Sequence, residues 1–200
     1  MTTEAPPAWA PMHLAGFPQY YQLSDPAMDG DPGSGPNAGN NCGPETWAMI
    51  LDYCHGISLD ADYLYDVIER LRQRHGEPTG LGYTYVTDGE RLLHFLSGGK
   101  TRPVTTWVDP SKPYSTTPGT PSAEILWTIW KALTYGHPLS ALISWSAPNA
   151  SDGHFIAIHG MSPTTIYTAD PIKGPRQFSY EEFWSWSKGI VTEAKRGAFV

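Results

Sequence analysis

The chain has 200 residues, of which 40% are hydrophobic and 16% are charged, and its formal net charge at pH 7 is −7. This length and composition predict one globular domain with its own core and exclude a disordered protein. They also disfavour a nucleic-acid partner, which requires clustered Lys and Arg, and no apolar run approaches the roughly 20 residues of a membrane span.

The N-terminal residues 1–18 are rich in proline and are predicted to form an extended arm or linker, with the domain itself at residues 19–200. The start of the chain has neither the basic stretch nor the apolar stretch of a secretory signal. We therefore expect a soluble protein that is cytoplasmic or released without a signal peptide.

A short strand is predicted at residues 19–23, and the following residues 24–41 are rich in Gly, Pro, Asp and Asn, which is typical of a loop. The loop contains Asp25, Asp29 and Asp31, but it lacks the spacing and the final Glu of a calcium loop. We therefore predict a solvated loop that binds no metal, and no cofactor elsewhere.

Helical periodicity begins abruptly at Cys42. An apolar face with i, i+3, i+4, i+7 spacing is formed by Trp47, Ile50, Leu51 and Cys54. Pro and Glu follow in the first turn and a Gly stands at the end, as expected for helix termini. Further helices are predicted at residues 60–74, 88–96 and 122–136.

The C-terminal third is rich in β-branched and apolar residues separated by turn residues, which favours strands. Strands are predicted at residues 103–108, 139–145, 154–160, 164–169 and near residue 190. Ser179 and Glu182 form a capping box that begins a short helix ending at Trp186. Helices followed by strands predict an α+β fold, with a helical half packed on an antiparallel sheet.

The two cysteines, Cys42 and Cys54, are expected to have different roles. Twelve residues along one helix separate them by about 18 Å, which is too far for a disulfide. Cys42 begins the helix, where exposed N–H groups and the helix dipole stabilise a thiolate, so we predict that it is a nucleophile. Cys54 lies on the apolar face and is predicted to be a small buried side chain.

A nucleophilic thiolate needs a base that later protonates the leaving group, and one histidine can do both. His154 begins a strand directly after a turn, and Asp170 ends the next strand of a predicted hairpin. Antiparallel pairing brings these two ends together, so Asp170 is expected to orient His154. His159 has the opposite parity on the strand and is predicted to be structural.

Four segments, in order, resemble the papain-like cysteine peptidases, in the branch of bacteriocin-processing, double-glycine-leader peptidases and their free-standing bacterial and phage relatives. They are GNNCGPETWAMILDYCHG, GHPLSALISW, GHFIAIHG and TIYTADPIKG, within residues 19–187. The resemblance implies a papain-like α+β fold whose nucleophile helix packs on the sheet. It also implies the triad Cys42, His154 and Asp170.

The resemblance further implies a Gln upstream of the nucleophile whose amide joins the Cys backbone N–H in the oxyanion hole. Gln22 is the matching residue and Gln19 the second candidate, although family members have this Gln only a few residues before the Cys. Here the loop of residues 24–41 intervenes, and Asn40 or Asn41 is an alternative donor.

The sequence therefore predicts a cysteine hydrolase that cleaves a peptide or other amide bond through a thioester, with a peptide or protein as substrate. Two alternatives stay open. One is a cell-wall endopeptidase or amidase that acts on peptidoglycan peptides, which the acidic net charge does not favour. The other is a catalytically silent papain-like module used for binding.

Overall fold

The computed structural model describes residues 10–21 and 41–196. In chain order the elements are β1 (Met12–His13), α2 (Cys42–His55), α3 (Ala61–Arg74), α4 (Val86–Leu96), β2 (Thr101–Trp107), α5 (Pro121–Thr134), β3 (Leu139–Ile143), β4 (His154–Met161), β5 (Thr165–Asp170), β6 (Gly174–Ser179), α6 (Tyr180–Trp186) and β7 (Ser187–Arg196). The α+β class predicted from the sequence is confirmed.

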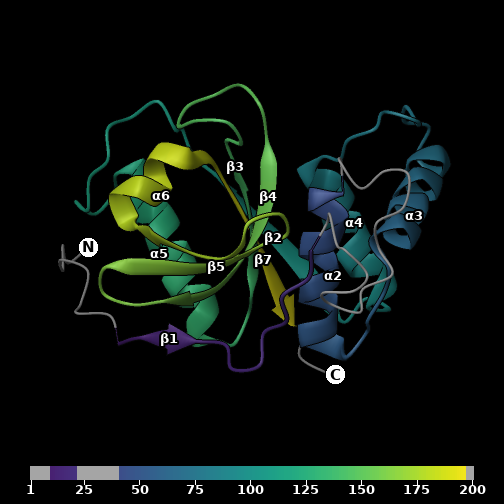
Figure 1. Ribbon diagram of the computed structural model, residues 1–200, viewed down its shortest axis with the longest axis horizontal. Coiled ribbons are helices and arrows are strands. Elements are labelled where there is room, and N and C mark those ends of the chain that lie inside the picture. Colours follow the sequence, from purple (N-terminus) through teal and green to yellow (C-terminus); the bar gives the residue numbers. More distant parts are fainter. Residues whose placement is uncertain (1–9, 22–40, 197–200) are drawn as a thin grey trace.

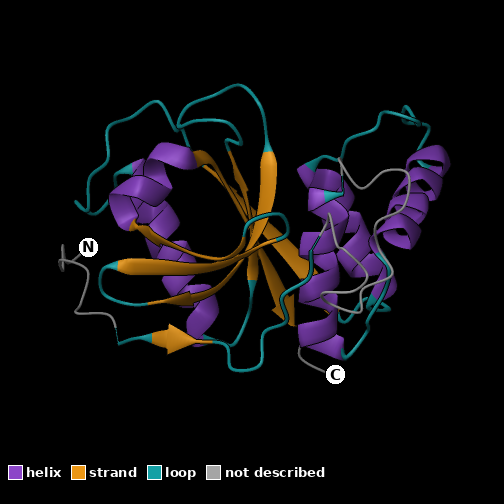
Figure 2. Cartoon of the chain, viewed as in Figure 1, coloured by secondary structure: helices purple, strands orange, loops and turns teal. Residues whose placement is uncertain are grey.

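The sheet stands between two groups of helices. Figure 1 shows α2, α3 and α4 on one side, with α2 next to β4, and α5 and α6 on the other side. Figure 2 shows the same division by type of secondary structure, with the strands in the middle. None of the helices in the described part of the chain has the length and apolar character that a bilayer span requires.

All strand pairs of the sheet are antiparallel, and the strand order is β2-β7-β3-β4-β5-β6. β1 pairs with the last two residues of β4, beyond the stretch that pairs with β3. In the described part of the chain β2 and β6 are the edge strands, and each contains a proline, Pro103 and Pro175.

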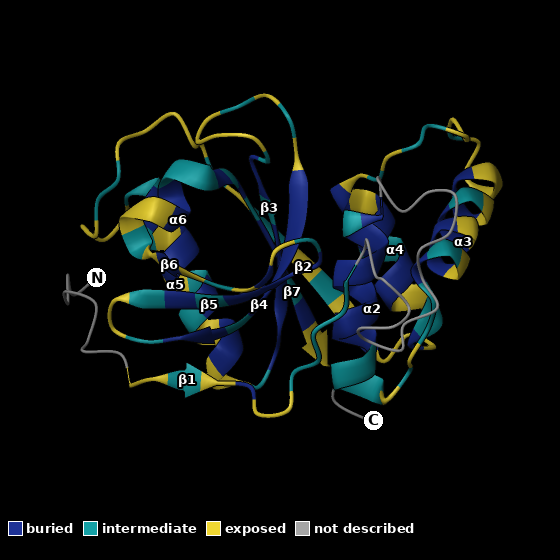
Figure 3. Ribbon diagram, viewed as in Figure 1, coloured by how far each residue is buried: buried dark blue, intermediate teal, exposed yellow. Residues whose placement is uncertain are grey.

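The core has two main parts. One lies between α5, α6 and the sheet, and the other joins α2, α3 and α4 with residues of the sheet such as Phe155. β4 contributes to both, because Ile156 and Ile158 belong to the first part and Phe155 to the second. Figure 3 shows α2 buried along most of its length, whereas the outer face of α3 is exposed. The helix that begins at Cys42 is thus fixed by packing on both flanks.

Two glycines allow the close packing at the start of α2. A Cβ atom on Gly43 would lie 2.3 Å from Oγ1 of Thr84 and 3.0 Å from the Trp47 ring. A Cβ atom on Gly89 would lie 2.2 Å from the same ring. The segment before α4 is therefore in direct contact with the first turn of α2, which a side chain at residue 43 would prevent.

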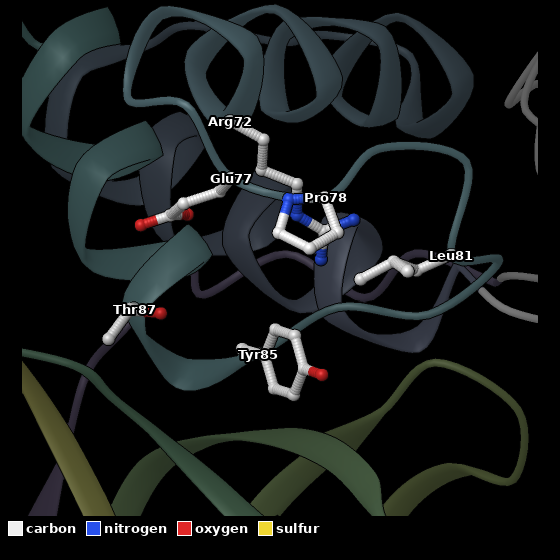
Figure 4. Close-up of a pocket in the computed structure, with 6 residues that line it drawn as sticks. All are labelled: Arg72, Glu77, Pro78, Leu81, Tyr85 and Thr87. Carbon is white, nitrogen blue, oxygen red and sulfur yellow. The ribbon is translucent and has the colours of Figure 1, made fainter.

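A buried ion-pair hub connects α3 to α4. The Arg72 guanidinium, 1% exposed, donates to both carboxylate oxygens of Asp88 at 3.0 and 2.6 Å and to Glu69 at 2.7 Å. It also contacts the face of Tyr85, 5.6 Å from the ring centroid. A hollow of about 250 Å³ adjoins this hub, and Figure 4 shows its lining residues Arg72, Glu77, Pro78, Leu81, Tyr85 and Thr87.

Several predicted elements need correction. Residues 19–21 form no strand, and residues 10–18 lie against the sheet domain, with Leu14 in the core. The third helix begins at Val86, two residues earlier than predicted, because Asp88 accepts a hydrogen bond from the Tyr85 amide and caps it there. The strand β6 was not predicted, since Gly174–Ser179 includes a proline and lacks clear apolar alternation.

Candidate active site

The β4–β5 hairpin brings His154 and Asp170 together. Ala157 pairs with Ala169, so the start of β4, with His154, and the end of β5, with Asp170, lie side by side. The Nε2 atom of His154 lies 2.9 Å from Oδ1 of Asp170. His154 is 2% exposed and Asp170 is 0% exposed, so this polar pair lies in a nearly water-free setting.

Cys42 is near the imidazole of His154 and is partly buried at the first position of α2. Burial lowers the pKa of His154, but the hydrogen bond to Asp170 and the interaction with the Cys42 thiol outweigh it and raise the pKa to about 9. Because Nε2 is used by Asp170, Nδ1 is the ring nitrogen left for Cys42.

Asp170 is held by more than the histidine. Its Oδ1 also accepts the backbone N–H groups of Ile172 and Lys173 at 2.9 and 3.0 Å, and its Oδ2 accepts Nη1 of Arg176 at 3.1 Å. Burial alone raises the pKa of Asp170, but the hydrogen bond and charge of His154, with the two amides, lower it to about 2. The carboxylate is therefore ionised over the whole physiological range.

An aromatic side chain borders this site on the sheet side. The ring of Trp145 contacts the His154 ring with centroids 4.7 Å apart. On the helical side, Thr84 contacts the first turn of α2 beside Cys42, and its neighbours Tyr83 and Tyr85 are 48% and 50% exposed. The site thus has a sheet-side wall that offers the aromatic surface of Trp145.

The predicted oxyanion donors have different outcomes. Gln22 and Asn40 lie outside the described residues. Gln19 lies near the site, but its Nε2 donates to the backbone oxygens of Tyr20 at 2.9 Å and Asp170 at 3.0 Å. The buried Asn41 donates through Nδ2 to Asp62 at 2.7 Å. Gln22 thus stays a prediction, and the amides of the two described candidates bind other groups.

The other candidate side chains lie elsewhere. His159 stacks on Phe17, with ring centroids 5.2 Å apart and 9° between the planes, and sits at a register shift of β4. Burial, followed by the charge of His13, lowers its pKa to about 4. His137 bonds through Nδ1 to Glu193 at 2.6 Å. Cys54 is half-buried, and burial raises its pKa despite a nearby arginine.

No cluster of three or more His, Cys, Asp or Glu side chains that could hold a metal ion occurs in residues 10–21 and 41–196. The predicted loop aspartates Asp25, Asp29 and Asp31 lie outside the described residues.

Two contributors to the site were missed from the sequence. Arg176 lies on β6, which was not predicted, so nothing indicated that its guanidinium would meet Asp170. Trp145 follows β3 directly, and its contact with His154 depends on the path of the turn between β3 and β4.

Comparisons with known proteins agree with this geometry. The model of the Peptidase_C39 like family matches residues 14–188. The structure resembles that of a C39-like peptidase from Bacillus anthracis, with a TM-score of 0.61 and 17% identity, covering 94% of this chain and 99% of that one. It also resembles the peptidase domain of Streptococcus ComA, a bifunctional ABC transporter of a quorum-sensing pathway. There the TM-score is 0.55 and the identity 14%, over 79% of this chain and 93% of that one.

These matches confirm the papain-like α+β fold and the resemblance on which it was predicted. No curated protein matches the chain.

Proposed function

Because this chain belongs to the Peptidase_C39 like family, we propose that it is a cysteine peptidase that cleaves a peptide or other amide bond through a thioester on Cys42. Peptidase activity is supported by the family, and the roles of individual residues are part of the proposal. The observation that supports them most is the buried His154–Asp170 hydrogen bond beside the first residue of α2.

In the proposed reaction the Cys42 thiolate attacks the carbonyl carbon of the scissile bond. The new C–S bond forms as the carbonyl oxygen takes the negative charge, and Nδ1 of His154 then gives its proton to the leaving amine. The C–N bond breaks and a thioester remains. His154, now neutral, takes a proton from water, whose oxygen attacks the thioester and releases the acid product and Cys42.

The charge on the oxyanion needs hydrogen-bond donors that are already in place. The backbone N–H of Cys42 is one of the unpaired N–H groups at the start of a helix, and the side-chain amide of Gln22 is the proposed second donor. Gln19 would then have a supporting role, since it connects the N-terminal segment to the backbone oxygen of Asp170, the last residue of β5.

The test uses a thiol-reactive probe and a peptide library. Wild-type protein should be labelled at Cys42 and should cleave library peptides, whereas Cys42→Ala and His154→Ala should keep the fold and lose cleavage. Cleavage by Cys42→Ala would refute the assigned nucleophile. Labelling without cleavage of any peptide or peptidoglycan fragment would instead favour a silent binding module.

The oxyanion donor is tested with the same substrates. Gln22→Ala should lower kcat by roughly 10²–10³, as removal of one oxyanion donor does, with little change in KM. Alkylation of Cys42 by iodoacetamide should persist in this variant, because alkylation forms no oxyanion. A comparable loss confined to Gln19→Ala or to Asn41→Ala would move the role to that residue.

A further inference from the structure

Substrate atoms on the leaving-group side must pass close to His154, because this residue gives the leaving amine its proton. Trp145 lies against the imidazole, with ring centroids 4.7 Å apart and the two planes tilted by 57°. The part of a substrate that follows the scissile bond therefore runs along the sheet-side wall, over or beside the Trp145 indole. The side chains around Trp145 therefore determine which groups of the substrate can bind there.

Lys173 is the charged side chain at this place. Its ammonium nitrogen lies 4.6 Å from the centroid of Trp145 and 5.7 Å from that of Trp186. Its backbone N–H donates to Asp170, so the turn that carries it is attached to the histidine's own partner. The turn is thus attached to the catalytic pair, and the ammonium of the exposed Lys173 side chain lies against the two indole rings.

No neighbouring carboxylate forms an ion pair with the Lys173 ammonium in the described part of the chain. Arg176, the second cation near Trp186, is paired with Asp170 at 3.1 Å. Asp152, the acid nearest in sequence to the Trp145 turn, accepts the backbone N–H groups of Trp145 and Ser146. None of the ion pairs of the described residues includes Lys173, so its ammonium has no anionic partner there.

We propose that Lys173 and Trp145 form a subsite for a carboxylate on the leaving-group side of the scissile bond. This inference rests on the proposed function and adds a substrate class to it, namely peptides with an acidic group just after the cleaved bond. The carboxylate is either an Asp or Glu side chain or the free C-terminus of a short peptide. A chain with 20 acidic and 13 basic residues repels acidic peptides in general, so one unpaired ammonium at the site gives local selectivity.

The test uses two synthetic peptide pools of identical sequences, one with free C-termini and one with C-terminal amides. Cleavage sites of the wild-type protein are identified by mass spectrometry. If the subsite binds an acidic side chain, Asp or Glu should be found at the first or second position after the cleaved bond in both pools. If the subsite binds the C-terminal carboxylate, cleavage should occur one or two residues from the C-terminus, and only in the pool with free C-termini.

The best peptide is then compared with its neutral counterpart, in which Gln, Asn or a terminal amide replaces the carboxylate. The wild-type protein should cleave the acidic form about fivefold faster in kcat/KM, which is the scale of one partly exposed ion pair. Lys173→Met should abolish this ratio and Lys173→Arg should keep it. Lys131→Met, a matched change of an exposed lysine on α5, should keep it as well.

Each outcome bears on the subsite. Cleavage without preference for a carboxylate, or a full ratio in Lys173→Met, overturns the subsite and leaves the proposed peptidase activity intact. Failure to cleave any peptide in either pool overturns the proposed function and the subsite together.

Discussion

The most informative single substitution is Asp170→Asn, whose effect is measured as a change in the pKa of His154. The carboxylate pKa falls from 3.8 to about 2 even though burial opposes this. The coupling between two charges acts equally on both, so the charge of Asp170 contributes to the raised pKa of His154, about 9, together with Cys42. We expect its removal to lower the pKa of His154 by about 1.5 to 2 pH units, which is about 2–3 kcal/mol.

The experiment is best done in the Cys42→Ala background, because the thiol also raises the pKa of His154. The imidazole of His154 is followed by NMR against pH in Cys42→Ala and in Cys42→Ala/Asp170→Asn. With the charge removed, burial should bring the pKa of His154 below its ordinary value of 6.5. Asp66→Asn, a substitution of an exposed residue on α3, is the control and should leave the pKa of His154 unchanged.

A difference below about half a pH unit would refute the electrostatic reasoning, because it would mean that a buried ion pair at 2.9 Å contributes less than an exposed one. In that case Asp170 would orient the imidazole without stabilising its charge. The variant also leaves Nη1 of Arg176 facing an amide instead of a carboxylate, so circular dichroism should accompany the titration to confirm that β5 and β6 remain paired.

Three further outcomes are expected. Iodoacetamide at neutral pH should alkylate Cys42 before Cys54, whose pKa is raised by burial, and mass spectrometry showing the reverse order would contradict the assignment. Gly43→Ala should destabilise the fold by about 1–3 kcal/mol in urea unfolding, and adding Thr84→Ala should recover part of the loss, since the added Cβ would meet Oγ1 at 2.3 Å. Because the pKa of Asp170 is about 2 when folded against 3.8 when exposed, its stabilisation should be complete above about pH 4 and lost toward pH 2. Asp170→Asn should flatten this part of the stability profile, and an unchanged acid midpoint would refute it.

The parts of the fold that sequence alone predicted depend on short-range patterns. Helix α2 has a clear apolar face and an end marked by Gly56, with φ 64°. The pairing of His154 with Asp170 could be predicted because only a hairpin separates them, so two strand ends and a short loop define the geometry. Both features follow from rules that need no knowledge of distant segments.

The parts that were missed depend on contacts between distant segments. Gln19 bonds to the backbone of Asp170, 151 residues away, and residues 19–21 form no strand. Likewise, Gly43 has to be glycine because of Thr84, which lies in the segment before α4. Such contacts are set by how the two halves of the core pack, and periodicity within one segment contains no information about them.

The edge strand β2 also has a consequence for association between molecules. The N–H of Ala194 on β7 donates to the backbone oxygen of Pro138, so the backbone polar groups of Ala194 point toward β3. Pro103 on β2 pairs with Ala194, so the backbone polar groups of Pro103 point away from β7. At that outward position an ordinary residue would offer an amide hydrogen to a strand of another molecule, and proline has none. A hydrogen-bond ladder started along β2 would be interrupted near its middle. The sheet is thereby protected at this edge against the strand-by-strand addition with which aggregation begins.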